Sequence, residues 1–589
     1  MYPASPRRLL WLTGLTAVIG LLAGGAAWVL LHLIGLLTNA TLFHRFDWTV
    51  PSFVDLRVTP AIVATVLVGG LLVSLLARWA PAIRGHGIPE AMEAILTKQS
   101  RVEPRMAVAK PLSAAIAIGT GGPFGAEGPI IVTGGAIGSI VGQVLPVSPS
   151  ERKILLASGA AAGMAATFGS PLAAVVLAIE LLLFEFSTRA LVPLVVAASV
   201  AGGVHALLLG SGPLFTVPHH QFAGLGSLPL FALMGLLCGL FAVVISKGLF
   251  LVEHGFRLLP VGEFWHPVIG AAGFVAVGWM VPTALGVGYD RIGAVLGGRV
   301  AVGTLAVLCV AKLVAWWVAL GSGTSGGTLA PLLLVGGCFG ALFGHLVGSI
   351  APGLGVGPGA FALVAMAATF GSASGARFTS IVFLFELTGD YQLILPLMLA
   401  TVLAELVASS LVRDRLMTEK LARRGLTVQG DYHADVLAGT RVAEVMSAPV
   451  ETINVAATIK EAQAIALAQG HGALPLVDTE NRCVGVVGRL DLLAADDEDA
   501  ALITIANEDV VSVAPHSSLL DALSLLLEEE VDHLPVVEDD RLVGMCTRTD
   551  ILAARRQQLS HERIEPGLVS HLRRRAKNRR TAPGDGQHQ

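Results

Sequence analysis

The sequence predicts a polytopic α-helical membrane protein with an inverted internal repeat, followed by a soluble α/β domain pair. Of the 589 residues, 54% are hydrophobic and 14% are charged, against about 25% charged in a typical soluble protein. The charges are unevenly spread, because residues 1–430 contain 24 Lys/Arg and 17 Asp/Glu, whereas the shorter remainder contains 15 and 26. In addition, both the apolar part and the charged part contain internal repeats.

The chain starts with a positively charged pair followed by a long apolar stretch. Arg7 and Arg8 precede about thirty mostly apolar residues that run to Leu37. The apolar core of a signal peptide has only roughly 7–15 residues, so we expect a first membrane helix that is retained. Further apolar segments are expected near 60–79, 111–145, 154–184, 190–210, 228–252, 267–283, 300–320, 329–351, 359–388 and 393–412.

Basic residues flank both ends of this apolar part. Besides Arg7 and Arg8, a second basic run follows the last apolar segment: Arg413, Arg415, Lys420, Arg423 and Arg424. Cytoplasmic loops carry an excess of Lys and Arg. We therefore expect a multi-pass protein of the plasma membrane with both termini in the cytoplasm.

Other functional classes are not supported. The net charge of −4 gives no basic surface for nucleic acid. The motifs GxxxxGK[ST] and HExxH are absent, which argues against a nucleotide motor and a metalloprotease. Single, scattered cysteines predict neither disulfides nor a metal site; they are Cys238, Cys309, Cys338, Cys483 and Cys546. We expect a protein that is not an enzyme and requires no metal or cofactor.

An internal repeat divides the apolar part into two homologous halves, which we place at about 60–210 and 228–412. Met164–Ser170 (MAATFGS) recurs letter for letter as Met366–Ser372, an offset of 202. The same offset pairs residues upstream: Pro129 with Pro331, Gly134 with Gly336, Gly138 with Gly340, and Gly142 with Gly344. Paired halves with interrupted helices are typical of transporters, whose substrate site lies between the halves near the membrane midplane.

Three glycine-containing loops lie at interruptions of the apolar segments. They are Gly85–Ala91 (GHGIPEA), Gly125–Ile130 (GAEGPI) and Gly326–Pro331 (GGTLAP). Each places glycine before a proline suited to the first turn of a helix, so that free backbone N–H groups lie at the positive end of a helix dipole. Helix N-termini bind anions. Three of them converging in the membrane predict an anion site that needs no fixed positive charge.

These loops and Phe383–Tyr391 (FLFELTGDY) resemble the signature segments of the CLC family of chloride channels and chloride/proton exchangers. The resemblance extends over about residues 80–412, in order and spacing. It implies a CLC-type fold and a homodimer in the lipid bilayer, in which each subunit has its own pore for chloride or a similar small anion. The implied anion-binding residues are Gly85, His86, Gly87, Ile88, Pro89, Gly125, Ala126, Gly128, Pro129, Gly327, Thr328, Leu329 and Met417.

Glu127 is the first candidate for a functional side chain. An ionisable group among apolar neighbours at membrane depth is costly and therefore indicates function. A carboxylate beside helix N-termini can occupy the outermost anion site as a tethered anion, and protonation would release it. The resemblance assigns this position the gating glutamate. It also matches Lys110 to a lysine that raises the local positive potential, with an interfacial lysine as the alternative.

Three positions in the anion site depart from the family pattern. His86 replaces the usual serine hydroxyl of the first loop; an imidazole can still donate, and near neutral pH it can become cationic. Met417 stands where a tyrosine normally closes the central site, and Leu329 replaces a phenylalanine. These changes leave room for a different anion selectivity.

The predicted proton path also departs from the pattern. Many exchangers carry a second, proton-carrying glutamate, but here Glu180 is followed by Leu181, which cannot carry a proton. We expect Glu180 and Glu386 to belong to structural hydrogen-bond networks rather than to a proton path. Glu405, a lone acid in the last apolar segment, fits either role.

The charged C-terminal part contains a second repeat. Short β-rich segments in 473–487 recur in 533–546, at an offset of 59 or 60. They alternate with helices and resemble a tandem pair of CBS domains, named after cystathionine β-synthase. Such pairs often bind adenosine nucleotides. Thr547 and Asp550 can hold a ribose, and the first copy retains Asp491; a purely structural pair is the alternative.

The predicted boundaries follow from these patterns: 1–415 for the transmembrane domain, 416–437 for a linker, 438–498 and 499–558 for the two CBS domains, and 559–589 for a basic, disordered tail. The predicted function is transport of chloride or similar anions, gated by Glu127 and tuned by the CBS pair. Because Leu181 cannot carry a proton, we expect channel-like conduction. The alternatives are a proton-coupled chloride exchanger, since some family exchangers lack that glutamate, and a fluoride- or nitrate-selective transporter.

Overall fold

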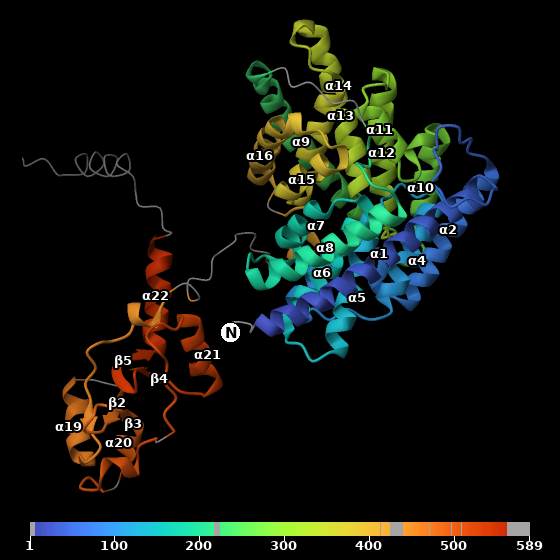
Figure 1. Cartoon of the computed structure of the whole chain (residues 1–589). Coiled ribbons are helices and arrows are strands. Elements are labelled where there is room, and N and C mark those ends of the chain that lie inside the picture. The colour runs from blue at the N-terminus through green and yellow to red at the C-terminus, as the bar shows by residue number, and fades with distance from the viewer. Residues whose placement is uncertain are drawn as a thin grey trace, which may run out of the picture. The chain divides into compact units, whose positions relative to one another are not determined.

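The computed structural model describes residues 6–216, 224–412, 414–424, 437, 440–469, 472–495, 497–507 and 509–561. The chain divides into two compact units, Ala4–Tyr432 and His433–Gln589, which are described separately (Figure 1). The predicted tail from residue 562, most of the predicted linker, and Arg413 lie outside the described residues. The described start of the linker packs in the first unit, where Leu416 and Met417 are buried.

The first unit is entirely helical in its described part. Its α-helices are α1 (Pro6–Leu42), α2 (Pro60–Trp79), α3 (Ile88–Thr97), α4 (Met106–Gly119), α5 (Glu127–Val144), α6 (Pro149–Phe168), α7 (Pro171–Ala178), α8 (Thr188–Leu208), α9 (Leu228–Arg257), α10 (His266–Met280), α11 (Tyr289–Leu296), α12 (Val302–Gly321), α13 (Leu329–Ile350), α14 (Pro358–Ser374), α15 (Arg377–Thr388), α16 (Ile394–Leu411) and α17 (Glu419–Ala422). A π-helical turn, Ile179–Leu183, extends α7.

Seven of the helices in the described residues are long and apolar enough to cross a membrane. Three predicted apolar segments, 111–145, 154–184 and 359–388, are each broken into two helices. The breaks fall at glycines with positive φ, namely Gly121 (100°), Gly169 (64°) and Gly375 (80°), where glycine has no steric penalty. Such interrupted helices allow helix ends to lie at membrane depth inside the protein.

The helices confirm an inverted internal repeat. Each helix of the series α1–α8 has a counterpart in α9–α16, and α1 packs on α4, α6 and α8 as α9 packs on α12, α14 and α16. This packing extends the first half back to α1. At the centre, the equivalent loops exchange backbone hydrogen bonds, Gly125 N to Gly327 O (3.2 Å) and Gly327 N to Gly125 O (2.8 Å). That reciprocal pairing is what a two-fold axis between the halves requires.

Small residues bring α5 and α6 into backbone contact. A Cβ added at Gly134 would overlap the carbonyl oxygen of Gly159, and one added at Gly159 would overlap that of Gly134. Close approach through glycine is typical of helix pairs in membranes. The contact fixes α5, whose first residue is Glu127.

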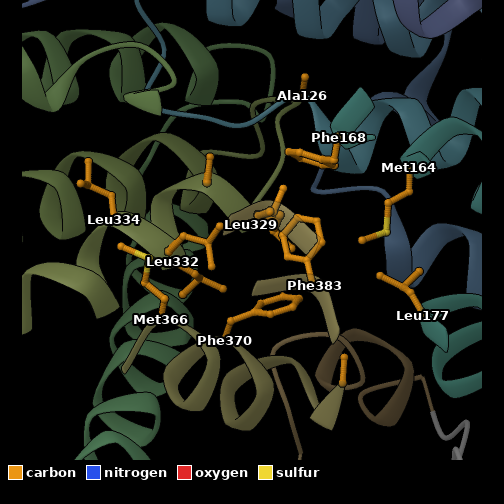
Figure 2. Packing of buried hydrophobic residues seen from close by; sticks show 14 of the residues in the cluster. Ala126, Met164, Phe168, Leu177, Leu329, Leu332, Leu334, Met366, Phe370 and Phe383 are labelled. Atoms are coloured by element: carbon orange, nitrogen blue, oxygen red, sulfur yellow. The ribbon is translucent and has the colours of Figure 1, made fainter. Parts of the chain in front are cut away.

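Apolar side chains from both halves fill the space around the start of α13. Figure 2 shows Met164, Leu177, Leu329 and Phe370 in this cluster, which also contains Phe168 and Phe383. The rings of Phe168 and Phe383 pack edge to face with centroids 5.0 Å apart, an arrangement that aromatic pairs prefer.

The second unit contains two small α/β subdomains, one for each copy of the repeat. The first copy has β1 (Ile453–Asn454), α19 (Ile459–Gln469), β2 (Ala473–Val477), β3 (Cys483–Gly488) and α20 (Arg489–Ala494), and the second has α21 (Leu519–Glu528), β4 (His533–Glu538), β5 (Arg541–Thr547) and α22 (Arg548–His561). Strand β2 pairs with β1 in parallel and with β3 antiparallel, and β4 pairs antiparallel with β5. Each copy has its own apolar core.

Candidate anion site between the two halves

Glu127 lies where the halves meet. It begins α5, and its side chain is 2% exposed. The hydroxyl of Tyr289, the first residue of α11, donates a hydrogen bond to Glu127 Oε1 (3.1 Å). The carboxylate also lies near the backbone amides of Glu127 and of Ala330 at the start of α13. The N-termini of α5 and α13 therefore face one buried carboxylate, and their dipoles favour its negative charge, while α11 contributes the hydroxyl of Tyr289.

Two equivalent glycines make room for this carboxylate. The position of a Cβ on Gly125 overlaps the Glu127 carboxylate, and a Cβ on Gly327 would lie 2.5 Å from Glu127 Oε2. The paired loops thus form a cradle lined by backbone. In this structure the side chain of Glu127 itself occupies that cradle.

A small cavity lies beside the carboxylate. Its volume is about 10 Å³, roughly what one water molecule needs, so it is too narrow for a hydrated anion. The wall combines residues from α3, α5, α6, α7, α13, α14 and the segment before α17: Ile88, Glu127, Gly128, Ile131, Met164, Leu177, Thr328, Leu329, Phe370 and Met417. The structure therefore brings together five predicted site residues with Glu127: Ile88, Gly128, Thr328, Leu329 and Met417.

The other predicted anion-site residues are buried in the same loops. These are Gly85, His86, Gly87, Pro89, Gly125, Ala126, Pro129 and Gly327. Several of them fix how closely the loops pack. A Cβ on Gly128, for example, would overlap the carbonyl oxygen of His86.

His86, which was predicted to donate to the anion, is not among the residues that line the small cavity. Ile88, rather than His86, supplies this loop's side chain to the cavity wall. The imidazole is 2% exposed, and its Nδ1 has no hydrogen-bond partner among the described residues. Glu90, Lys110 and Lys420 are the charged groups around it.

Two buried lysines occupy equivalent positions in the halves. Lys110 Nζ donates to the carbonyl oxygens of Ile83 (2.7 Å) and Gly85 (2.8 Å). Lys312 Nζ donates to those of Ala284 (3.1 Å) and Gly286 (2.6 Å). Both side chains are 0% exposed, so Lys110 is not an interfacial lysine. Each tethers the loop that leads into a short helix, α3 or α11.

Tyr289 and Lys312 are the residues that sequence reasoning missed. The signal was present in the repeat, because Gly286-Val-Gly-Tyr289 aligns with Gly85-His-Gly-Ile88 at an offset of 201. Lys312 aligns with Lys110 at an offset of 202 residues. Extending the repeat in both directions from its identical segment would have identified both.

Glu180 and Glu386 cap helices of the opposite half. The Glu180 carboxylate accepts from the amides of Arg377 (2.8 Å) and Thr379 (3.0 Å) and from the Thr379 hydroxyl (2.8 Å) at the start of α15. Glu386 accepts from the amides of Leu172 (3.1 Å) and Ala173 (2.7 Å) at the start of α7. The two glutamates are 206 residues apart. They are related by the two-fold axis, and each caps a helix of the other half.

The remaining residues of the predicted proton path are also engaged or apolar. Leu181 is 4% exposed, in the π-helical turn after α7. Glu405 pairs with Arg377 (3.2 Å) and Arg415 (2.6 Å). Glu405 therefore belongs to an ion-pair network.

Of the predicted nucleotide residues in the described part of the second unit, Asp491 lines a cavity whose wall does not include Thr547 and Asp550. Thr547 Oγ1 donates to Asp550 Oδ2 (2.7 Å) and accepts from the Asp550 amide (3.2 Å), so this pair caps α22. Asp491 lines a cavity of about 320 Å³ that includes residues of both copies, among them Asp532 and His533. Burial lowers the pKa of His533, so that its ring is neutral at pH 7.

Comparisons with known proteins agree with this architecture. The profile of the voltage gated chloride channel family matches residues 68–409, and that of the CBS domain matches residues 442–498 and 502–557. Among curated relatives, the H⁺/Cl⁻ exchange transporter ClcA of Vibrio campbellii is 33% identical over 379 residues, covering 62% of this chain and 81% of the relative. ClcA of Vibrio vulnificus strain YJ016 is 30% identical over 448 residues, covering 72% and 94%.

Solved structures show the same fold. A slow cyanobacterial Cl⁻/H⁺ antiporter aligns with a TM-score of 0.63 and 24% identity, covering 72% of this chain and 99% of that one. A CLC-type fluoride/proton antiporter aligns with a TM-score of 0.60 and 21% identity, covering 69% and 98%. The chain is a multi-pass membrane protein with a C-terminal CBS domain pair, and it belongs to the voltage gated chloride channel (CLC) family.

Proposed function

We propose that this protein exchanges chloride for protons across the plasma membrane, as a homodimer without enzymatic activity. One observation carries the proposal: a buried, protonatable carboxylate, Glu127, fills a cradle of helix N-termini. Chloride and the carboxylate compete for such a cradle because both are anions. Protonation of Glu127 vacates it, so that proton binding and chloride binding become linked.

The relatives favour exchange over the channel-like conduction that Leu181 suggested. Those compared above at 30% identity or more are named H⁺/Cl⁻ exchange transporters. The proposed orientation has both ends of the membrane unit in the cytoplasm. It is supported by the basic residues near these ends, namely Arg7, Arg8, Lys420, Arg423 and Arg424, because cytoplasmic loops carry an excess of Lys and Arg.

A proton route that avoids Leu181 is supported by a cavity next to α3 that several charged side chains line. Its volume is about 760 Å³, and its wall includes Glu90, Glu93 and Lys420. Glu90 Oε2 accepts from the Gly87 amide (2.8 Å), beside His86. Water in this cavity would bring protons to the loop at the anion site without using position 181.

Leu181→Ala is therefore expected to leave proton coupling unchanged. The measurement is chloride efflux from liposomes containing the purified protein, with external pH recorded and the voltage set by valinomycin. Proton movement that tracks chloride, in the parent and in Leu181→Ala alike, supports exchange. Chloride release without proton movement in the parent protein contradicts exchange and supports a channel. Repeating the assay with fluoride and nitrate tests the choice of chloride.

For the second unit we propose an adenine nucleotide site in the Asp491 cavity. Residues of both CBS copies line it, and Asp491 is in its wall whereas Thr547 and Asp550 are not. Asp491→Ala is expected to weaken ATP, ADP or AMP binding to the full-length protein at least about tenfold, the effect of losing roughly 1.4 kcal/mol. Asp550→Ala is the matched control, expected to affect stability more than binding. Equal loss in both variants, or no binding by the parent, contradicts this site.

A further inference from the structure

Tyr289 is held rigidly beside the gate. Its ring packs edge to face on Phe168 (centroids 6.4 Å apart) and lies 6.3 Å from the ring of Phe215. The Phe215 amide in turn donates to the carbonyl oxygen of Leu387 (2.9 Å). The ring thus packs on Phe168 of the first half and on Phe215 of the segment between the halves, and in this position its hydroxyl bonds to Glu127 Oε1.

Only the second half of the internal repeat has a hydroxyl at this position. Tyr289 occupies the position equivalent to Ile88, and Val287 the position equivalent to His86. Ile88 lines the small cavity and offers no donor to Glu127. The carboxylate therefore has a side-chain hydroxyl partner on the α11 side and an apolar neighbour on the α3 side.

Tyr289 also separates the carboxylate from solvent. It lines a pocket of about 590 Å³, which we call the Tyr289 pocket, with Leu214, Phe215, Thr216, Asp290, Gly293, Ala294 and Arg299. Asp290 and Arg299 are exposed there. On its other side, the tyrosine bonds to Glu127, which is 2% exposed.

We infer that Tyr289 is a positioning residue for the gate: its hydroxyl holds deprotonated Glu127 in the anion cradle and sets how readily a proton from the Tyr289 pocket releases it. The inference deepens the proposed exchange and rests on Glu127 acting as the gate. A hydrogen bond donated to a carboxylate stabilises its charged form and is stronger than a bond between neutral groups. Without the hydroxyl, Glu127 accepts a proton and leaves the cradle more easily.

Other charged groups near the gate do not replace the hydroxyl. The positive charge of Lys312 on α12 attracts the carboxylate of Glu127, and the negative charge of Asp290 attracts the ammonium of Lys312. The ammonium of Lys312 already bonds to two backbone carbonyls. On the α3 side, the positive charge of Lys110 attracts the carboxylate of Glu90.

The test is the pH dependence of chloride flux in liposomes containing full-length protein, for Tyr289→Phe and its parent. Phenylalanine keeps the ring packing and removes only the hydroxyl. The pH of half-maximal flux is expected to move up by about one unit, a tenfold change in proton affinity. Tyr391→Phe is the matched control, because Tyr391 is 71% exposed and packs on Phe385 instead; its profile should match the parent.

The double variant separates a gate effect from a structural one. In Glu127→Gln, adding Tyr289→Phe should change nothing further, because no carboxylate remains to be held. A Tyr289→Phe profile that superimposes on the parent, or flux lowered equally at every pH, overturns the inference. Proton movement is recorded in the same runs. If the parent shows no coupling, the proposed exchange fails, while the pH shift still tests the role of Tyr289 at the gate.

Discussion

Glu127→Gln is expected to abolish proton coupling and flatten the pH dependence of chloride flux while leaving chloride transport intact. Glutamine has the size of a protonated glutamate, so it can leave the cradle but cannot carry a proton or compete as an anion. Because the protonated carboxyl opens the path, flux in the parent falls about tenfold per pH unit above the midpoint of its titration. In the variant we expect less than about a twofold change over the same range.

The matched control for this change is Glu185→Gln. Glu185 pairs with Lys153 (3.7 Å), and its side chain is 46% exposed. The substitution removes the same charge at the surface of the membrane unit, and both coupling and pH profile should remain those of the parent. Retained coupling in Glu127→Gln would show that protons cross by another group, and Glu127 would then be an anchor for α5 rather than the gate.

Much of the fold could be predicted from the sequence because its signals are local or repetitive. Low charge density indicated the membrane unit, and the identical Met164–Ser170 and Met366–Ser372 segments fixed the relation of the halves. Helix breaks within long apolar runs were harder to place. They depend on single glycines such as Gly169 and Gly375 adopting positive φ, and glycine alone does not distinguish a break from a close helix contact such as Gly134.

The sequence was enough to predict which loops form the site, but not which side chains contact one another there. The three loops and Glu127 were identified because helix N-termini leave a recognisable glycine pattern. Whether His86 or Ile88 faces the cavity depends on loop backbone geometry, with Gly85 and Gly87 at φ of 96° and 102°, and the order of residues does not encode it directly. Glu127 and Tyr289 are 162 residues apart, and only the three-dimensional pairing of the halves brings them together.

Gly134→Ala is expected to destabilise the membrane unit and abolish transport, whereas Gly135→Ala is not. The added Cβ at Gly134 would overlap the Gly159 carbonyl oxygen, while at Gly135 the nearest heavy atoms lie at 3.6 Å, an ordinary contact. Overpacking typically costs about 1–3 kcal/mol. We expect the upper end of that range here, because the atom that must yield belongs to the backbone of α6 rather than to a flexible side chain.

The two variants form a matched pair that isolates the contact. They are adjacent in α5, and each gains the same helix propensity, about 1 kcal/mol, when alanine replaces glycine. The measurement is the fraction of protein that stays monodisperse in detergent after heating, together with chloride flux. Since α5 begins at Glu127, displacing it from α6 moves the carboxylate relative to Gly327 and the cradle loses its shape. Equal thermal stability in Gly134→Ala and Gly135→Ala would mean that α5 and α6 have room between their backbones, and that Glu127 is positioned by the loop pairing alone.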